Sequence, residues 1–140
     1  MAPSVHGTVV VIGGAGALLV GASGSGKSDL ALRLIDRGAV LLADDRVDLT
    51  VEAGQLLARA PAGLPPLLEV RGIGLLPAQP VAGPIPVAAV FELGRASERL
   101  PVPELWRYES IAVPLFRIDP TTASAAARVR AVMASRPVAA

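Results

Sequence analysis

The chain begins with short apolar runs that glycines separate. The β-branched run Thr8–Ile12 and the apolar run 17–20 flank a glycine-rich turn at 13–16. Runs of this length, joined by such a turn, are typical of two strands in a β-hairpin. A loop of glycine and serine follows at 21–26. The pattern therefore predicts a hairpin that leads directly into a small-residue loop.

Helical spacing comes next. In residues 27–37, Leu30 and Leu34 recur on one face, and Gly38 stands just past the last periodic residue. This spacing predicts an α-helix, and the glycine is typical of a helix C-terminal cap. The continuous apolar run 39–43 predicts a buried central strand. Two aspartates, Asp44 and Asp45, follow it.

The second half of the chain alternates strand patterns with proline-rich segments. Further strands are predicted over 47–51, Gln55–Arg59, Leu67–Val70, Ile85–Leu93 and Ile111–Ile118. The first two of these would form a hairpin. Pro114 favours an edge position for the last strand, because proline cannot donate to a ladder. Irregular structure is expected at 60–66 and 77–84, and a surface excursion at 94–106.

An alanine-rich stretch closes the chain. It predicts a helix over 121–135, capped at Asp119 or Thr121, with fraying after Ser135. Hairpins combined with a strand–helix–strand crossover predict an α/β fold with a mixed central sheet and flanking helices. A length of 140 residues fits a single domain, 1–140.

Composition excludes several classes of protein. The chain is 52% hydrophobic, which excludes disorder, and its net charge of +1 argues against nucleic acid as a partner. It has no cysteine and one histidine, which excludes disulfides, thiolate metal sites and a histidine-rich zinc site. We see no secretory leader and no apolar stretch near the ~20 residues that a membrane span needs. The expected compartment is the cytoplasm, without a membrane partner.

The loop and the start of the helix carry a complete phosphate-loop motif, G-x-x-x-x-G-K-S. Backbone N–H groups of such a loop cradle phosphates, and the helix N-terminus favours the anion. Lys27 is the only lysine in the chain, and it falls at the position that contacts the β- and γ-phosphates. Ser28 offers a hydroxyl ligand to Mg²⁺. The predicted nucleotide-binding residues are Gly21, Ala22, Ser23, Gly24, Ser25, Gly26, Lys27 and Ser28.

The paired aspartates are the second chemical signal. If the helix joins two parallel strands, their carboxyl ends share one edge of the sheet, so Asp44 and Asp45 should lie near the γ-phosphate. A carboxylate there can orient Mg²⁺ or accept a proton from an attacking hydroxyl. The competing interpretation is a turn or helix cap, which aspartate also favours. His6, taken alone, is more typical of a surface or packing residue.

These residues resemble the bacterial HPr kinase/phosphorylase family. Five stretches occur in the same order as in that family: Val5-His6-Gly7, the phosphate loop, Arg37-Gly38, Ala43 to Val47, and the signature-like stretch from Leu68 to Gly74. The last stretch discriminates, because many unrelated enzymes share a phosphate loop. The resemblance runs from Val5 to Leu76 and is thin beyond.

The resemblance implies an ATP- and Mg²⁺-dependent kinase that phosphorylates a serine of the phosphocarrier protein HPr. It also implies the reverse phosphorolysis by inorganic phosphate, which releases pyrophosphate. Asp44 would act as general base, and as general acid in reverse, supported by Asp45 and His6. Ser28 and Glu69 would hold Mg²⁺, and Arg71 would help to bind phosphate or partner. Arg117 is the candidate arginine for phosphorolysis.

The chain departs from longer family members. The motifs begin at Val5, which indicates a short form with the catalytic domain only. In longer members the C-terminal part contacts HPr and supports a hexamer, so homo-oligomerisation stays open. Two other classes also stay open, a small-molecule kinase of the shikimate or gluconate type and a non-enzymatic nucleotide-binding module. A GTPase is disfavoured, because the chain has no asparagine for an Asn-Lys-x-Asp guanine motif.

Overall fold

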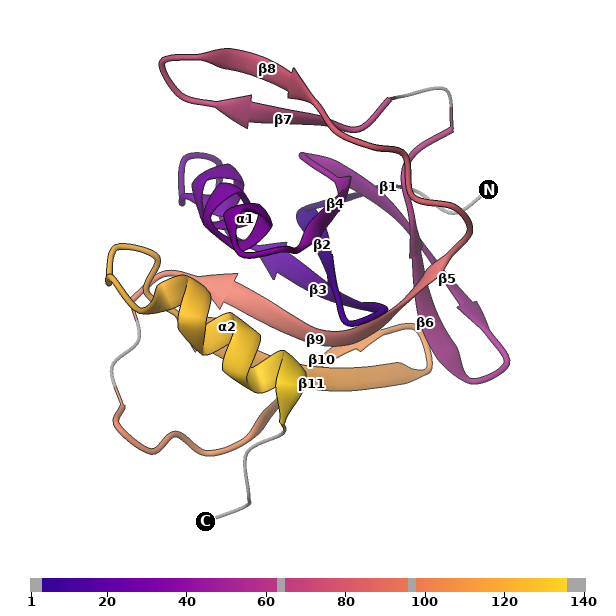
Figure 1. Cartoon of the computed structure of the whole chain (residues 1–140). Coiled ribbons are helices and arrows are strands. Elements are labelled where there is room, and N and C mark those ends of the chain that lie inside the picture. The colour runs from indigo at the N-terminus through magenta and orange to yellow at the C-terminus, as the bar shows by residue number, and fades with distance from the viewer. Residues whose placement is uncertain (1–3, 63–64, 96–97, 136–140) are drawn as a thin grey trace.

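The computed structural model describes residues 4–62, 65–95 and 98–135. Figure 1 shows a curled sheet, with both helices on one side of it and a separate hairpin above α1. The elements are β1 (Ser4–His6), β2 (Thr8–Ile12), β3 (Ala15–Val20), α1 (Lys27–Asp36), β4 (Val40–Ala43), β5 (Arg46–Glu52), β6 (Gln55–Arg59), β7 (Leu67–Val70), β8 (Gly74–Pro77), β9 (Ile85–Leu93), β10 (Glu104–Tyr108), β11 (Ile111–Ile118) and α2 (Ala125–Ala134). The predicted α/β class with a mixed sheet is confirmed.

The large sheet turns around its longest strand, β9. Its path runs β1-β5-β6-β9-β3-β2-β4, and β11 pairs with β9 and with β10. β9 is parallel to β3 and β11 but antiparallel to β6. β6 pairs with the start of β9 at Ile85 and Pro86, whereas β11 pairs with its last residues. Because two partners share β9 in succession, the sheet curls instead of lying flat.

Two apolar clusters cover the two faces of the sheet. Side chains alternate along a strand, so neighbouring residues of β3 and β9 enter different clusters. Leu19 and Phe91 pack with α1 and α2, whereas Leu18 and Val90 pack with the strands of the curl, including β5 and β6. All four side chains are fully buried. Burial of both faces of β3 fixes the start of the loop that follows Val20.

Most predicted elements are confirmed. β2 and β3 form the hairpin, β5 and β6 form the second hairpin, and α1 ends just before Arg37 with Gly38 at φ +104°. β7, β9 and β11 also lie where the pattern predicts them, and α2 lies within its predicted range. The residues after Ser135 lie outside the described part of the chain.

Two strand positions were predicted wrongly. β4 is not central: it ends the sheet path and pairs with β2, and Val40 is 42% exposed. Its other three residues are buried: Leu41 packs against α1 and β7, and Leu42 and Ala43 pack in the cluster that includes β5 and β6. β11 is not an edge strand, because it lies between β9 and β10. Pro114 is accommodated because the pairing with β9 starts only at Leu115.

Other differences are local. The excursion predicted for 94–106 contains the start of β10, whose charged side chains lie on a solvated ladder with β11. β1 and β8 were not predicted. α2 starts after Ser124, not at the predicted caps. Asp119 instead accepts hydrogen bonds from the backbone N–H and hydroxyl of Thr121 in the preceding turn.

Candidate functional site

The glycine–serine loop (residues 21–26) joins the end of β3 to the start of α1. Gly21 has φ +150°, and a Cβ there would lie 2.7 Å from the Ser25 hydroxyl and 3.3 Å from the Leu93 carbonyl oxygen. Gly26, at φ +104°, is the N-cap position of α1. A side chain at either position would strain the backbone. The two glycines therefore allow the chain to turn tightly from strand to helix.

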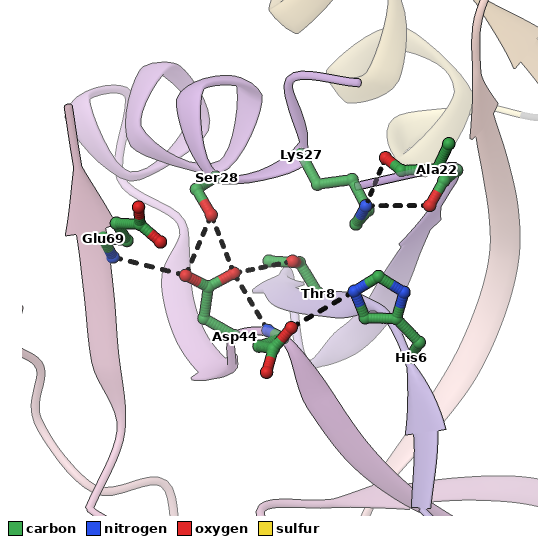
Figure 2. Close-up of polar contacts among 9 residues, drawn as sticks. His6, Thr8, Ala22, Lys27, Ser28, Asp44 and Glu69 are labelled. Atoms are coloured by element: carbon green, nitrogen blue, oxygen red, sulfur yellow. Dashed lines mark hydrogen bonds and ion pairs between the residues drawn. The ribbon is translucent and has the colours of Figure 1, made fainter. Parts of the chain in front are cut away.

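Lys27 is buried at the first position of α1. Its exposed fraction is 7%, and its Nζ donates hydrogen bonds to the carbonyl oxygens of Gly21 (2.8 Å) and Ala22 (3.0 Å). Figure 2 shows the lysine side chain reaching back to the start of the loop. A buried ammonium group is costly unless it has partners, and here the loop carbonyls supply them. The positive charge is thereby held at the loop.

The hydroxyl of Ser25 lies inside the same loop. It is buried and has no hydrogen-bond partner among the described residues. A buried hydroxyl without a partner costs free energy, so such an atom needs an explanation. A bound anion that accepts a hydrogen bond from it would supply one, which fits the residues of this loop to a phosphate group.

Asp44 lies at the end of β4 and accepts hydrogen bonds from four donors, three of which lie on other elements. Its Oδ1 accepts from the Thr8 hydroxyl at 2.7 Å and the Asp45 N–H at 3.1 Å. Its Oδ2 accepts from the Glu69 N–H at 3.3 Å. The Ser28 hydroxyl lies 3.0 Å from Oδ1 and 2.9 Å from Oδ2. The carboxylate is thus held from several sides (Figure 2).

Asp45 is placed differently from its neighbour. Its φ is +70°, which is uncommon for a residue other than glycine and is found often at functional sites. The side chain is 76% exposed, and its Oδ1 lies 3.1 Å from Nε2 of His6 on β1. The backbone supports this pair, because the N–H of Gly7 donates to the Asp45 carbonyl oxygen at 3.0 Å. One carboxylate is therefore enclosed, and the next is open and paired with histidine.

The topology explains why these residues meet. β2 is antiparallel to both β3 and β4, so β3 and β4 are parallel with one strand between them. Their carboxyl ends lie at the same edge, where α/β proteins bind ligands. The predicted approach of Asp44 to the loop–helix junction is confirmed by its contact with Ser28. His6 and Glu69 reach the same place from β1 and β7.

A cleft of about 780 Å³ lies beside these groups. Its walls come from the loop, α1, the end of β4, and β7 with its neighbouring segments. The charged or titratable side chains that line it are His6, Lys27, Asp29, Asp44, Asp45, Arg46, Glu69 and Arg71. Leu32, Leu42, Val70 and Leu75 supply an apolar part of the wall. The cleft therefore combines both signs of charge with an apolar side.

The oxygen groups in this cleft suit a hard cation. The Ser28 hydroxyl and the carboxylates of Asp44 and Glu69 are the kinds of ligand that Mg²⁺ prefers. The backbone of Glu69 is anchored on Asp44, and its side chain is exposed in the cleft. Within the described residues, no group of three or more His, Cys, Asp or Glu side chains could hold a metal alone. Mg²⁺ sites of phosphoryl-transfer enzymes typically need substrate phosphates as further ligands.

The structure does not bring Arg117 to this cleft. Arg117 lies on β11 and is paired in register with Glu92 of β9, which is paired in turn with Val20 of β3. Arg117 therefore lies two strands away from β3, the strand that leads into the loop. Its guanidinium group is paired with Glu104 on β10, at 2.9 Å, and with Glu92. The hydrogen bond from Arg117 lowers the pKa of Glu104, and the pKa of Arg117 is raised by the same bond. Its role in phosphorolysis stays a prediction.

Sequence reasoning did not single out two polar residues that lie next to the aspartates, Thr8 and Arg46. Thr8 is fully buried and donates to Asp44, but the pattern marked it only as the first residue of a strand. Arg46, at the start of β5, lines the cleft beside Asp45. The one signal in the sequence was the position of Arg46 directly after the paired aspartates. Nothing local could reveal Thr8, because its partner is 36 residues away.

Neither helix in the described part of the chain is long and apolar enough to cross a membrane.

Known proteins are similar to this chain in sequence and in fold. Residues 1–91 match the family model described as the HPr Serine kinase C-terminal domain. An HPr kinase/phosphorylase of Lactiplantibacillus plantarum is 54% identical over 74 residues, which are 52% of this chain and 24% of that protein. One of Bordetella pertussis is 38% identical over 127 residues, 82% of this chain and 41% of that protein. The chain thus spans less than half the length of these two relatives.

The fold comparison agrees. The solved structure described as the Hpr(Ser) kinase/phosphatase from Coxiella burnetii superposes with a TM-score of 0.81 at 25% sequence identity. The match covers 94% of each chain, so it includes the C-terminal strands and α2, which lie outside the matched family model. From the family model and these relatives, we conclude that the chain belongs to the family of the HPr serine kinase C-terminal domain.

Proposed function

We propose that this chain, residues 1–140, is a catalytic domain that transfers the γ-phosphoryl group of ATP to a serine of an HPr-like phosphocarrier protein. The observation that carries the proposal is the meeting of the glycine–serine loop, Ser28 and two adjacent aspartates in one cleft. Membership of the family supports the choice of HPr as the protein substrate.

The loop would bind the phosphates of ATP. Its backbone N–H groups and the N-terminus of α1 favour an anion. Lys27 already points at the loop, where its ammonium could exchange a carbonyl partner for a phosphate oxygen. The buried Ser25 hydroxyl would gain an acceptor by the same event. Positioning and charge stabilisation are the main sources of catalysis in phosphoryl transfer.

Ser28, Asp44 and Glu69 would hold Mg²⁺ together with the phosphates. A loop serine and an acidic residue at the end of a neighbouring strand form the usual protein side of such a magnesium site. The hydrogen bond between Ser28 and Asp44 supports this assignment. The ion would neutralise the charge that develops on the transferred phosphoryl group.

The geometry favours roles for the two aspartates that differ from the roles implied by the resemblance. Asp44 is occupied by four donors, one of which is Ser28, so we assign it to the magnesium side of the site. Asp45 is open to the cleft, and His6 holds one of its oxygens. We assign Asp45 as the proton acceptor, oriented by His6.

In the proposed forward step, each proton and leaving group has a defined acceptor or product. The substrate serine hydroxyl attacks the γ-phosphorus, its proton passes to Asp45, and ADP leaves with the bridging oxygen. In phosphorolysis, a hydrogen phosphate ion attacks the phosphorus of phosphoserine, its proton passes to Asp45, and Asp45 passes it on to the leaving serine oxygen. Pyrophosphate is the product. The same group would accept the serine proton in the forward transfer and return a proton to the serine oxygen in phosphorolysis.

The protein substrate would approach over the cleft mouth. Arg46 and Arg71 line the cleft, and their charge suits the phosphate of phosphoserine or an incoming inorganic phosphate. Homo-oligomerisation and a cytoplasmic location, without nucleic acid or membrane as partner, remain expectations of this proposal.

The test is incubation of the chain with purified HPr, ATP and Mg²⁺. We expect phosphate on a serine of HPr and its absence when Mg²⁺ is chelated. With phosphorylated HPr and inorganic phosphate, we expect pyrophosphate. Phosphate that appears on a small metabolite and not on HPr would favour the small-molecule kinase. ATP binding without transfer to any acceptor would favour a nucleotide-binding module.

A further inference from the structure

Thr8 is a polar side chain that the proposed function does not use. Among the described residues, Thr8 and Lys27 are the two buried polar or charged side chains, and the exposed fraction of Thr8 is 0%. Lys27 is explained by the loop it binds. Thr8 stands at the start of β2, where it is followed by buried valines of the sheet core. A valine would suit this strand position equally well by shape, so the hydroxyl needs its own explanation.

The hydroxyl has one specific contact. Thr8 Oγ1 donates to Asp44 Oδ1 at 2.7 Å, the shortest of the hydrogen bonds that this carboxylate accepts. A hydrogen bond to an ionised group is about twice as strong as one between neutral groups. Because Thr8 is buried between strands, its hydroxyl is fixed by the fold and can fix the carboxylate in turn.

The other donors to Asp44 cannot replace this contact. The Ser28 hydroxyl lies at nearly equal distances from both oxygens, so it does not select one rotation of the carboxylate. The N–H of Glu69 is 3.3 Å away and belongs to β7, in the small separate sheet. The Asp45 N–H belongs to the next residue of the chain, so it does not tie the carboxylate to another strand. Thr8 is the contact that ties Oδ1 to the core of the large sheet.

We propose that Thr8 is a positioning residue for the magnesium side of the site. It holds Asp44 Oδ1, so that the carboxylate and the Ser28 hydroxyl keep one arrangement toward a magnesium–nucleotide complex. This inference rests on the proposed function, because it assumes that Asp44 and Ser28 serve Mg²⁺. Partners that orient metal-binding groups typically change metal affinity or activity by about 10–100-fold when they are lost.

The test compares Thr8→Val, which keeps the shape and removes the hydroxyl, with Thr8→Ser, which keeps the hydroxyl. Binding of ATP is measured by calorimetry with Mg²⁺ and, separately, with EDTA. We expect Thr8→Val to weaken binding about tenfold with Mg²⁺ and to leave binding in EDTA unchanged. Thr8→Ser should stay within about threefold of the wild type in both conditions, because the loss of one methyl group is a small change.

Two controls separate this role from a structural one. Thr50→Val removes a threonine hydroxyl from β5 that bonds Glu52 and Arg59 instead of the site, and it should leave both affinities unchanged. Thermal unfolding of each variant checks the fold, and Thr8→Ala offers a second way to remove the hydroxyl if Thr8→Val does not fold.

The outcomes are distinct. Equal magnesium-dependent binding by the wild type and Thr8→Val overturns the inference, as does an equal loss in Thr8→Val and Thr8→Ser. A wild-type chain that binds ATP equally with and without Mg²⁺, or not at all, overturns the proposed function and this inference with it. A loss in Thr8→Val that Thr8→Ser does not share, confined to the magnesium condition, supports the inference.

Discussion

The hydroxyl of Ser28, on the first turn of α1, lies 3.0 and 2.9 Å from the two carboxylate oxygens of Asp44 at the end of β4. The two residues are 16 positions apart, and they meet because α1 crosses from β3 back to a parallel strand. The contact joins the two chemical signals of the sequence, the loop motif and the paired aspartates.

Replacement of the two aspartates by asparagine should separate their roles. We expect Asp45→Asn to lower the rate of phosphoryl transfer to HPr by about 10²–10⁴-fold, because a proton acceptor is lost. Its affinity for Mg²⁺-ATP should stay near that of the wild type. Asp44→Asn should instead weaken the magnesium-dependent part of ATP binding. Rates from single-turnover assays and affinities from calorimetry check both, and the opposite pattern would return the base role to Asp44.

Lys27→Ala tests the loop as a phosphate site. The ammonium group would make charge-assisted hydrogen bonds to phosphate, worth about 1.5–3 kcal/mol, so ATP affinity should fall by about 10–100-fold. Thermal stability should be compared as well, since Lys27 also bonds the Gly21 and Ala22 carbonyls. Arg59→Ala serves as a control, because its guanidinium group bonds the side chains of Thr50 and Glu52 instead of lining the cleft. Unchanged ATP affinity in Lys27→Ala would remove the loop from the proposal.

Gly21→Ala should destabilise the fold. The new methyl group would meet the Ser25 hydroxyl at 2.7 Å and the Leu93 carbonyl oxygen at 3.3 Å, at a φ of +150°. Backbone strain of this kind costs about 1–3 kcal/mol, before the cost of the clash. Gly54→Ala is the matched control, because φ is +75° and nothing lies within 4 Å of its added Cβ. Denaturant unfolding of both variants measures the difference. Equal losses would mean that φ alone sets the cost.

The Arg117–Glu104 pair should make stability depend on pH. Arg117 lowers the pKa of Glu104 from its ordinary 4.5, so the pair stabilises the fold above that pH and the contribution is lost as pH falls through the lowered value. Arg117→Gln should therefore lower the melting temperature slightly near pH 7. The difference from the wild type should shrink under acid conditions. The effect is small because both groups are solvent-exposed.

The same variant addresses phosphorolysis. If Arg117 serves that direction, Arg117→Gln lowers pyrophosphate release and leaves transfer from ATP to HPr unchanged. Glu104→Gln is the control, because it breaks the ion pair but leaves the arginine. Equal effects of the two substitutions on both reactions would assign Arg117 a structural role.

The elements that the sequence predicts correctly are those that depend on nearby residues only. The loop and α1 follow from glycine positions and from the spacing of Leu30 and Leu34, which depend on nearby residues only. The place of β4 does not, because an apolar run is equally well buried by strands or by α1 and β7. β10 is short and follows a charged segment broken by prolines, so its pattern resembles a loop until β11 pairs with it.

The site shows the same limit. Motifs and resemblance identified the loop, the aspartates, His6 and Glu69, and the structure brings all of them to one cleft. They could not show which aspartate is enclosed, since that depends on donors from β2, α1 and β7. Arg117 was selected by residue type alone; the structure pairs it with two glutamates from neighbouring strands, and its role in phosphorolysis stays a prediction.

The hairpin of β7 and β8 contributes one donor to Asp44 but forms a small sheet of its own, with Ile73 and Leu75 widely exposed. Leu68 is the one buried side chain of the two strands, and elements with so few buried contacts open at a lower free energy than a central sheet. Gentle warming should therefore detach this hairpin and abolish the proposed phosphoryl transfer while circular dichroism still reports an intact domain. Loss of that transfer and global melting would then be two separate events.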